Sequence, residues 1–270
     1  MDQKAVDQLS PLAADIKLHS PDRYLATLFA PPARRGALIA LYAFDHEMER
    51  IQTVVREPMA GLIRLQWWQD VIDDIEHGAT VAHPVVQALR GLIIDDGLDP
   101  AFLSRAIDGR RRRFEDEQPS SVSSYQRHLL EIGGSITSAA AALLGICDRE
   151  TMAAADRIGT AVAAWEQYRL LATAKRDDMV WQPQAWLQGS SDEAAGAANA
   201  DARMHLAALA SAELAEARRQ NPPIARAALS ALFPGTLVGI RLGDRARLIR
   251  QPTVPTAVPR LFWHWLRGRF

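Results

Sequence analysis

Two carboxylates in the first third of the chain have a spacing that could hold a divalent cation. Asp70 and Asp74 stand four residues apart, with Asp73 and Glu76 beside them. Residues i and i+4 of a helix share one face, so this pair could offer oxygen ligands to Mg²⁺. The cluster directly follows an apolar segment, and we favour a solvated acidic helix face as its explanation.

The strongest charge run is Arg110–Arg113. Four guanidinium groups could bind phosphate or the acidic surface of a partner. Glu115, Asp116 and Glu117 follow at once. This favours a helix end neutralised by salt bridges over a specific anion site.

The remaining reactive side chains form no recognisable catalytic motif. The seven histidines include no His-x-x-x-His pair, so a zinc site is not predicted. No Gly-x-Ser-x-Gly sequence and no glycine-rich phosphate loop occurs. The only cysteine, Cys147, excludes an intramolecular disulfide, and its apolar neighbours predict a buried thiol.

The elements that must position these groups are helices. Of the 270 residues 48% are hydrophobic, enough for a large core, and the net charge of −1 gives no overall attraction to nucleic acid. Apolar residues recur with helical spacing and no alternating β-branched run occurs, which predicts a single all-α domain over 1–270. We expect 1–19 to be flexible, 189–199 to be a loop and 251–255 a connector. Helices are expected from Ser20, from Pro32 and at 37–51, 62–71, 81–94, 101–114, 122–144, 149–173, 202–219, 229–248 and 256–270.

The terminal segment 260–270 combines aromatic and basic side chains. Phe262, Trp263, Trp265 and Arg267 suit a membrane interface, and equally a helix whose aromatic side closes the core. No stretch of 18 uncharged apolar residues and no signal peptide is found. We therefore expect a cytoplasmic protein, or one attached peripherally to the inner face of the cytoplasmic membrane.

Several segments between Asp22 and Leu248 together resemble the squalene/phytoene synthase family. The sharpest match is Leu41-Tyr42-Ala43-Phe44, followed by Leu65-Gln66-Trp67-Trp68. Glu131–Ser135 resembles the family's small-residue turn before a packed helix, and Arg169 stands where an arginine often precedes an aspartate. The resemblance implies an isoprenoid-synthase-like helical bundle.

The family's metal-binding aspartates are missing at the matching positions. Members usually carry two aspartate pairs with i, i+4 spacing, which hold Mg²⁺ against a prenyl diphosphate. Here the first pair falls on Glu49 and Thr53, and the second on Leu170 and Ala174. The resemblance thus implies that no catalytic residue is retained and that no metal or other cofactor is needed. It also implies that the old cavity is lined by residues such as Tyr42, His46 and Arg169.

One non-catalytic branch of the family, that of a mitochondrial complex I assembly factor, shows the same loss. It carries a segment like Gly61–Trp68 after a charged linker like Val54–Glu57. The resemblance implies a non-enzymatic assembly or interaction factor whose partners include respiratory complex I subunits. Two alternatives stay open: a prenyltransferase with Mg²⁺ relocated to Asp70 and Asp74, and a carrier of an isoprenoid or other apolar lipid.

Overall fold

The computed structural model describes residues 3–75, 77, 81–115, 118–173, 181–187, 195–220, 224–243, 254–267 and 270. Within these residues all regular structure is helical and no strand occurs, as predicted. The elements are α1 (Gln3–His19), α2 (Pro21–Leu28), α3 (Pro32–Val54), α4 (Pro58–Ile75), α5 (Pro84–Arg90), η1 (Gly91–Asp95), α6 (Ala101–Glu115), α7 (Val122–Leu129), η2 (Leu130–Gly134), α8 (Ser135–Leu143), α9 (Arg149–Thr173), α10 (Gln184–Leu187), α11 (Ala195–Gln220), η4 (Arg226–Ala228), α12 (Leu229–Gly243) and α13 (Val254–Arg267).

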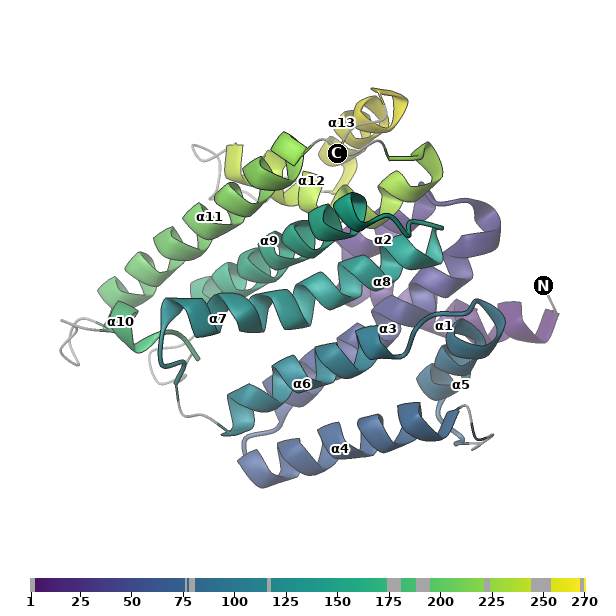
Figure 1. The fold of residues 1–270 in the computed structure, drawn as a ribbon, viewed down its shortest axis with the longest axis horizontal. Helices are drawn as coiled ribbons and strands as arrows, with labels where there is room; N and C mark the ends of the chain where they lie inside the picture. The colour runs from purple at the N-terminus through teal and green to yellow at the C-terminus, as the bar shows by residue number, and fades with distance from the viewer. Residues whose placement is uncertain are drawn as a thin grey trace.

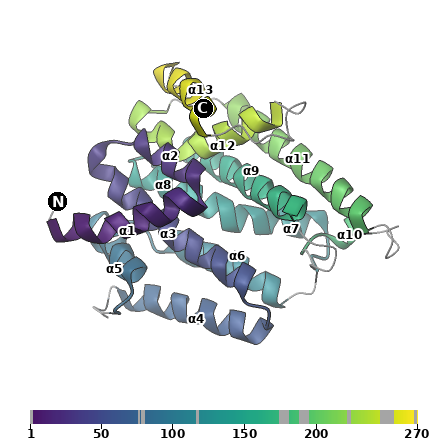
Figure 2. The same ribbon diagram turned by 180° about the vertical axis from the view of Figure 1, so that it is seen from behind.

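The helices form a bundle in which helices that are neighbours in space lie side by side (Figure 1). Figure 1 shows α4, α6, α8, α9 and α11 in succession across one face, each in contact with the next. Figure 2 shows α1 and α2 packed on α3 behind them, with α12 and α13 at the end where the chain terminates. No described helix is both long enough and apolar enough to cross a bilayer.

Prolines set several helix starts, as the sequence predicted for the first two. Pro21, Pro32, Pro58 and Pro84 each stand at the beginning of a helix. Proline is suited to this position because its missing N–H would have no partner in the first turn. The Pro31-Pro32 break therefore separates α2 from α3 and lets α2 fold back against it.

Three parts of the chain differ from the sequence expectations. Most of the range 1–19, expected to be flexible, is helix α1, and Ile16 on it is fully buried. The second half of the expected loop at 189–199 is helical, because α11 begins at Ala195. Cys147 is exposed, since α8 ends at Leu143 and Gly145, with φ of +87°, turns the chain outward.

The helix predicted at 122–144 is one continuous helical segment from α7 to α8, and its small residues Gly133 and Gly134 lie in a π-helical turn, η2, just before α8. A Cβ atom on Gly133 would lie 2.2 Å from the carbonyl oxygen of Gly159 on α9. Only glycine allows the two backbones to approach this closely. Gly133 and Gly159 therefore let α9 pack closely against the η2 turn.

Candidate functional site

One face of α3 carries the residues around which charged side chains gather. Asp45 and Glu49 lie four residues apart on α3 and so share a face. The structure brings to this face Arg23 from α2, Arg110 from α6 and Glu166 from α9. We call these five residues the charged cluster.

Asp45 is the buried centre of the charged cluster. Its side chain has no exposed surface, and its two carboxylate oxygens form ion pairs with Arg23 and Arg110. Both guanidinium groups are themselves buried, and Arg110 also donates to the carbonyl oxygen of Ala106 at 3.1 Å. A buried carboxylate is tolerated only with such partners, so this triad ties α2, α3 and α6 together.

Two half-buried carboxylates form the rim of the cluster. Arg23 donates to Glu166 at 3.1 Å and lies 4.0 Å from Glu49, while its guanidinium also stands 5.6 Å from the Tyr42 ring centre. The guanidinium thus lies within ion-pair distance of two carboxylates that come from different helices. The positive charge next to both carboxylates is therefore a side chain of the protein itself.

The pKa values of the two rim carboxylates, Glu49 and Glu166, shift in opposite directions. Burial raises the pKa of Glu166 to about 7, against the lowering effect of Arg23 and with a further rise from Glu49. Burial also acts to raise the pKa of Glu49, but the His46 side chain 3.9 Å away and the charges of Arg23 and Arg110 outweigh it and lower that pKa. Glu166 therefore exchanges its proton near neutral pH, while Glu49 stays ionised.

The pKa values of the two guanidinium groups, those of Arg23 and Arg110, shift as well. Burial lowers the pKa of Arg110 to about 10, partly offset by Glu49. For Arg23 burial acts in the same direction, but Glu166 and Glu49 outweigh it and the pKa is raised. Both groups thus remain positively charged at neutral pH and hold the cluster together.

The residues that we expected to line the old cavity lie near the cluster in different ways. Tyr42 is buried beside Arg23, and burial raises its pKa to about 12. His46 directs Nδ1 toward Glu49, 3.9 Å away, and Nε2 toward Asp15 on α1, 3.8 Å away. Arg169 is exposed near the end of α9, where its charge lowers the pKa of Glu166.

The aspartate positions of the family motifs do not fit a Mg²⁺ site. Of the first pair, Glu49 is engaged by Arg23, and the Thr53 hydroxyl donates to the Glu49 carbonyl oxygen of its own helix at 3.0 Å. Of the second pair, Leu170 has an apolar side chain and Ala174 lies outside the described residues. Mg²⁺ needs several free hard oxygen ligands, which these side chains do not offer.

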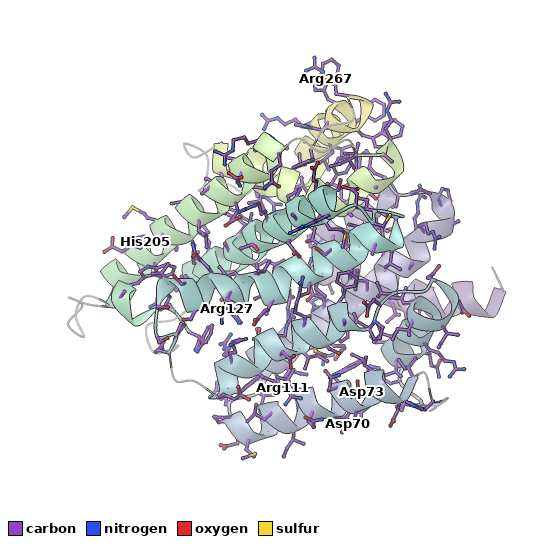
Figure 3. All side chains as sticks on the ribbon, viewed as in Figure 1. Asp70, Asp73, Arg111, Arg127, His205 and Arg267 are labelled. Atoms are coloured by element: carbon purple, nitrogen blue, oxygen red, sulfur yellow. The ribbon has the colours of Figure 1, made fainter. Side chains whose placement is uncertain are left out.

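The alternative metal pair lies away from the charged cluster. Asp70 and Asp74 are exposed on α4, and Figure 3 shows Asp70 at the edge of the molecule. Gln66 donates to Asp70 at 2.6 Å. No third carboxylate or histidine among the described residues joins them as a ligand group. This arrangement matches the solvated helix face that we favoured.

Three arginines of the run contact side chains of other helices, and two of the acids that follow it, Asp116 and Glu117, lie outside the described residues. Arg110 pairs with Asp45, and Arg112 makes two 2.8 Å hydrogen bonds to Glu131. Arg111 donates to Gln66 on α4 at 2.7 Å. The predicted salt bridges are present for Arg110 and Arg112, with partners on α3 and η2, and Arg111 lies 3.8 Å from Asp108 on its own helix.

A surface pocket of about 230 Å³ opens between α3 and α4 and is lined by residues of α3 other than those of the charged cluster. Two tryptophans form its apolar part, and two arginines give it a basic edge. Its lining residues are Glu47, Arg50, Ile51, Val54, Arg64, Trp67, Trp68 and His83. None of the charged cluster lines it.

Sequence reasoning found Glu49 but missed Arg23, Asp45, Arg110 and Glu166 as members of one site. The one available signal was Asp45, a carboxylate inside the apolar stretch of 37–44 that helical spacing places in the core. Its ion-pair partners lie on two other helices, α2 and α6, and Glu166 lies on a third, α9, so no local spacing reveals them.

Sequence comparison with known proteins matches the chain to one family. A sequence model of squalene/phytoene synthases matches residues 16–266. The NADH dehydrogenase (ubiquinone) complex I assembly factor 6 of Bos taurus is 29% identical over 138 residues, which are 51% of this chain and 41% of that protein. The Homo sapiens protein is 27% identical over the same shares. The chain therefore matches well under half the length of these relatives.

Solved structures share the fold at low sequence identity. A dehydrosqualene synthase in complex with ligand superposes with a TM-score of 0.74 and 18% identity, covering 89% of this chain and 87% of that one. Squalene synthase HpnC from Alicyclobacillus acidocaldarius gives 0.73 and 17%, covering 92% and 96%. The predicted isoprenoid-synthase-like bundle is confirmed.

Proposed function

The chain belongs to the squalene/phytoene synthase family, and we propose that it is a non-enzymatic assembly or interaction factor of the respiratory complex I type. It would act at the inner face of the cytoplasmic membrane and need no metal for this role. The relatives that carry the name of complex I assembly factor 6 support the proposal.

The observation that carries the proposal is the place of Arg23. Glu49 and Glu166 face each other from α3 and α9, and the Arg23 guanidinium pairs with both. Chemistry on a diphosphate requires cations that carboxylates hold and the substrate shares. Here a side chain of the protein itself compensates these carboxylates, so they are not free to hold such cations.

A protein partner has a suitable surface on α4. Met59, Ile63 and Trp67 recur every four residues and are all exposed. Their spacing places them in one apolar stripe, which leads to the pocket beside Val54. Arg50 and Arg64 border that pocket. A partner helix with an apolar stripe and acidic flanking residues fits this combination.

The aromatic end of the chain supports contact with a membrane surface. Phe262 and Trp263 are exposed on α13, while Leu261 and Phe270 are buried against the bundle. Arg267 lies 4.2 Å over the Trp263 ring, and Figure 3 shows it at the outer end of the molecule. Aromatic rings beside arginines suit the headgroup region of a bilayer.

Complementation of a deletion strain of the source organism tests the assembly role. We expect the wild-type chain to restore assembled complex I on native gels and NADH oxidation by membranes. The double variant Ile63→Asp/Trp67→Ala should not restore them, because it removes the apolar stripe. Met204→Asp is the matched control, since Met204 is an equally exposed apolar residue on α11.

The enzyme alternative is tested by diphosphate release from farnesyl and geranylgeranyl diphosphate, with and without Mg²⁺. We expect no release by the folded wild-type protein. Metal-dependent turnover, or normal complex I in the deletion strain, would overturn the proposal.

A further inference from the structure

A second group of side chains, outside the charged cluster, gathers where α1 crosses α3. Asp15 and His19 stand four residues apart on α1, and His46 faces them from α3. One donor atom from each residue can be chosen so that all three lie within 4.8 Å of one another. We propose that these three residues bind one zinc-like divalent transition metal ion.

The donor set has the composition that such ions prefer. Two imidazoles and one carboxylate suit zinc and related ions, and a three-residue set leaves a position for water. His19 Nδ1 lies 3.1 Å from Asp15 Oδ1, and His46 Nε2 lies 3.8 Å from Asp15 Oδ2. The Asp15 carboxylate thus already stands between nitrogens from two helices.

The donors need only small movements to close on an ion. Tetrahedral ligands at about 2.0–2.1 Å from zinc lie about 3.3 Å from one another. The His19 and His46 rings are stacked with centroids 4.6 Å apart, so binding would turn the rings and replace the 3.0 Å contact of His19 Nδ1 with the Asp15 carbonyl oxygen. Asp15 and His19 are 46% and 45% exposed, which leaves them room to turn and opens a path for the ion.

His46 is the fixed member of the group. Its side chain is only 12% exposed, and its Nδ1 is buried without a hydrogen-bond partner among the described residues. The carboxylate oxygen Oε2 of Glu49 lies 3.9 Å from this nitrogen. Metal-bound histidines commonly direct their second nitrogen to a carboxylate, which fixes the ring and strengthens the ligand. Glu49 is placed for this positioning role.

A bound ion would fasten α1 to α3. The described part of α1 contacts α2, α3 and α5, and the site lies at its last turn. Binding to the folded protein alone would raise its free energy of unfolding by an amount that grows with the logarithm of the free metal concentration.

Titration of the chelator-treated full chain with Zn²⁺, and with Co²⁺ as a coloured substitute, tests the proposal. We expect one tightly bound ion per chain, a higher unfolding temperature, and the visible absorption of tetrahedral Co²⁺. His19→Ala and His46→Ala should abolish all three, and Glu49→Gln should weaken binding about 10–100-fold. Circular dichroism checks that each variant is folded, and His19→Ala removes only an exposed side chain.

The chain supplies a matched control in α4 and the residues after it. His77 Nδ1 contacts the Asp73 carbonyl oxygen at 3.0 Å, the same local arrangement as His19 with Asp15, but no ligand from another helix joins it among the described residues. His77→Ala should leave the stoichiometry at one. The proposal is overturned if wild type binds no ion, if binding survives His19→Ala, or if His77→Ala abolishes it equally.

Discussion

Replacing Asp45 by asparagine removes the buried negative charge between two guanidinium groups. Arg110 would be left with the Ala106 carbonyl oxygen at 3.1 Å, whereas Arg23 would retain Glu166 at 3.1 Å and Glu49 at 4.0 Å. The asparagine amide would also turn N–H groups or a neutral oxygen toward two cations. Breaking one partner of a buried ion pair typically costs about 3–5 kcal/mol. We expect Asp45→Asn to lower the free energy of unfolding by that amount, which is a large share of the roughly 5–15 kcal/mol of a typical domain.

Urea unfolding of the purified variants measures this loss. The midpoint should fall while the dependence on urea concentration stays unchanged. Asp96→Asn is the matched control, because Asp96 pairs with Arg34 at 2.6 Å on the surface. An exposed pair contributes less than about 1 kcal/mol. If Asp45→Asn costs no more than the Asp96 control, the cluster does not hold the helices together and our reasoning is refuted.

Three further results are expected. The pKa of Glu166 in the folded protein is raised to about 7 from the usual 4.5. Its contribution to the free energy of unfolding is therefore present at low pH and is lost as the pH rises toward about 7. Glu166→Gln should remove this pH dependence from unfolding free energies measured between pH of about 5 and about 8. Gly133→Ala would place a Cβ atom 2.2 Å from a facing carbonyl oxygen and should cost about 1–3 kcal/mol in urea unfolding, whereas Gly243→Ala, with open space around it, should not. Phe262→Ser and Trp263→Ser should weaken sedimentation with anionic vesicles without lowering the unfolding temperature, because both side chains are exposed; unchanged sedimentation would remove the membrane from the proposal.

Helices could be predicted from the sequence because their signals are local. Prolines and apolar spacing reveal α3, α6 and α9 almost to the residue. The signals fail where packing decides. Helix α1 contains Pro11 and begins without an acidic first turn, and the π-helical turn at η2 depends on the approach of α9. Cys147 is exposed because the turn at Gly145 directs it outward, which its apolar neighbours could not reveal.

The candidate sites were harder to predict because their members come from several helices. Glu49 was found through the spacing of the family motif, whereas Arg110 was treated as part of a helix end neutralised by salt bridges. Its burial follows only from the packing of α6 on α3. The histidines gave no zinc signal for the same reason: Asp15 and His19 are local neighbours, but His46 joins them only through the crossing of α1 and α3. Sequence spacing reveals ligands on one helix, and tertiary structure supplies the rest.

The place of Arg23 explains how such a bundle can keep facing carboxylates without a metal. Two carboxylates directed at one space from α3 and α9 repel each other in a low dielectric unless a cation lies between them or one is protonated. Arg23 pairs with both, and the raised pKa of Glu166 shows that one guanidinium only partly offsets the effect of burial. A cation fixed to α2 is present in every folded molecule, whereas a metal ion or a substrate is present only when bound. Arg23 thus compensates the charge of these carboxylates without a bound ligand, and our proposal places the partner and the membrane at the outer surfaces of α4 and α13.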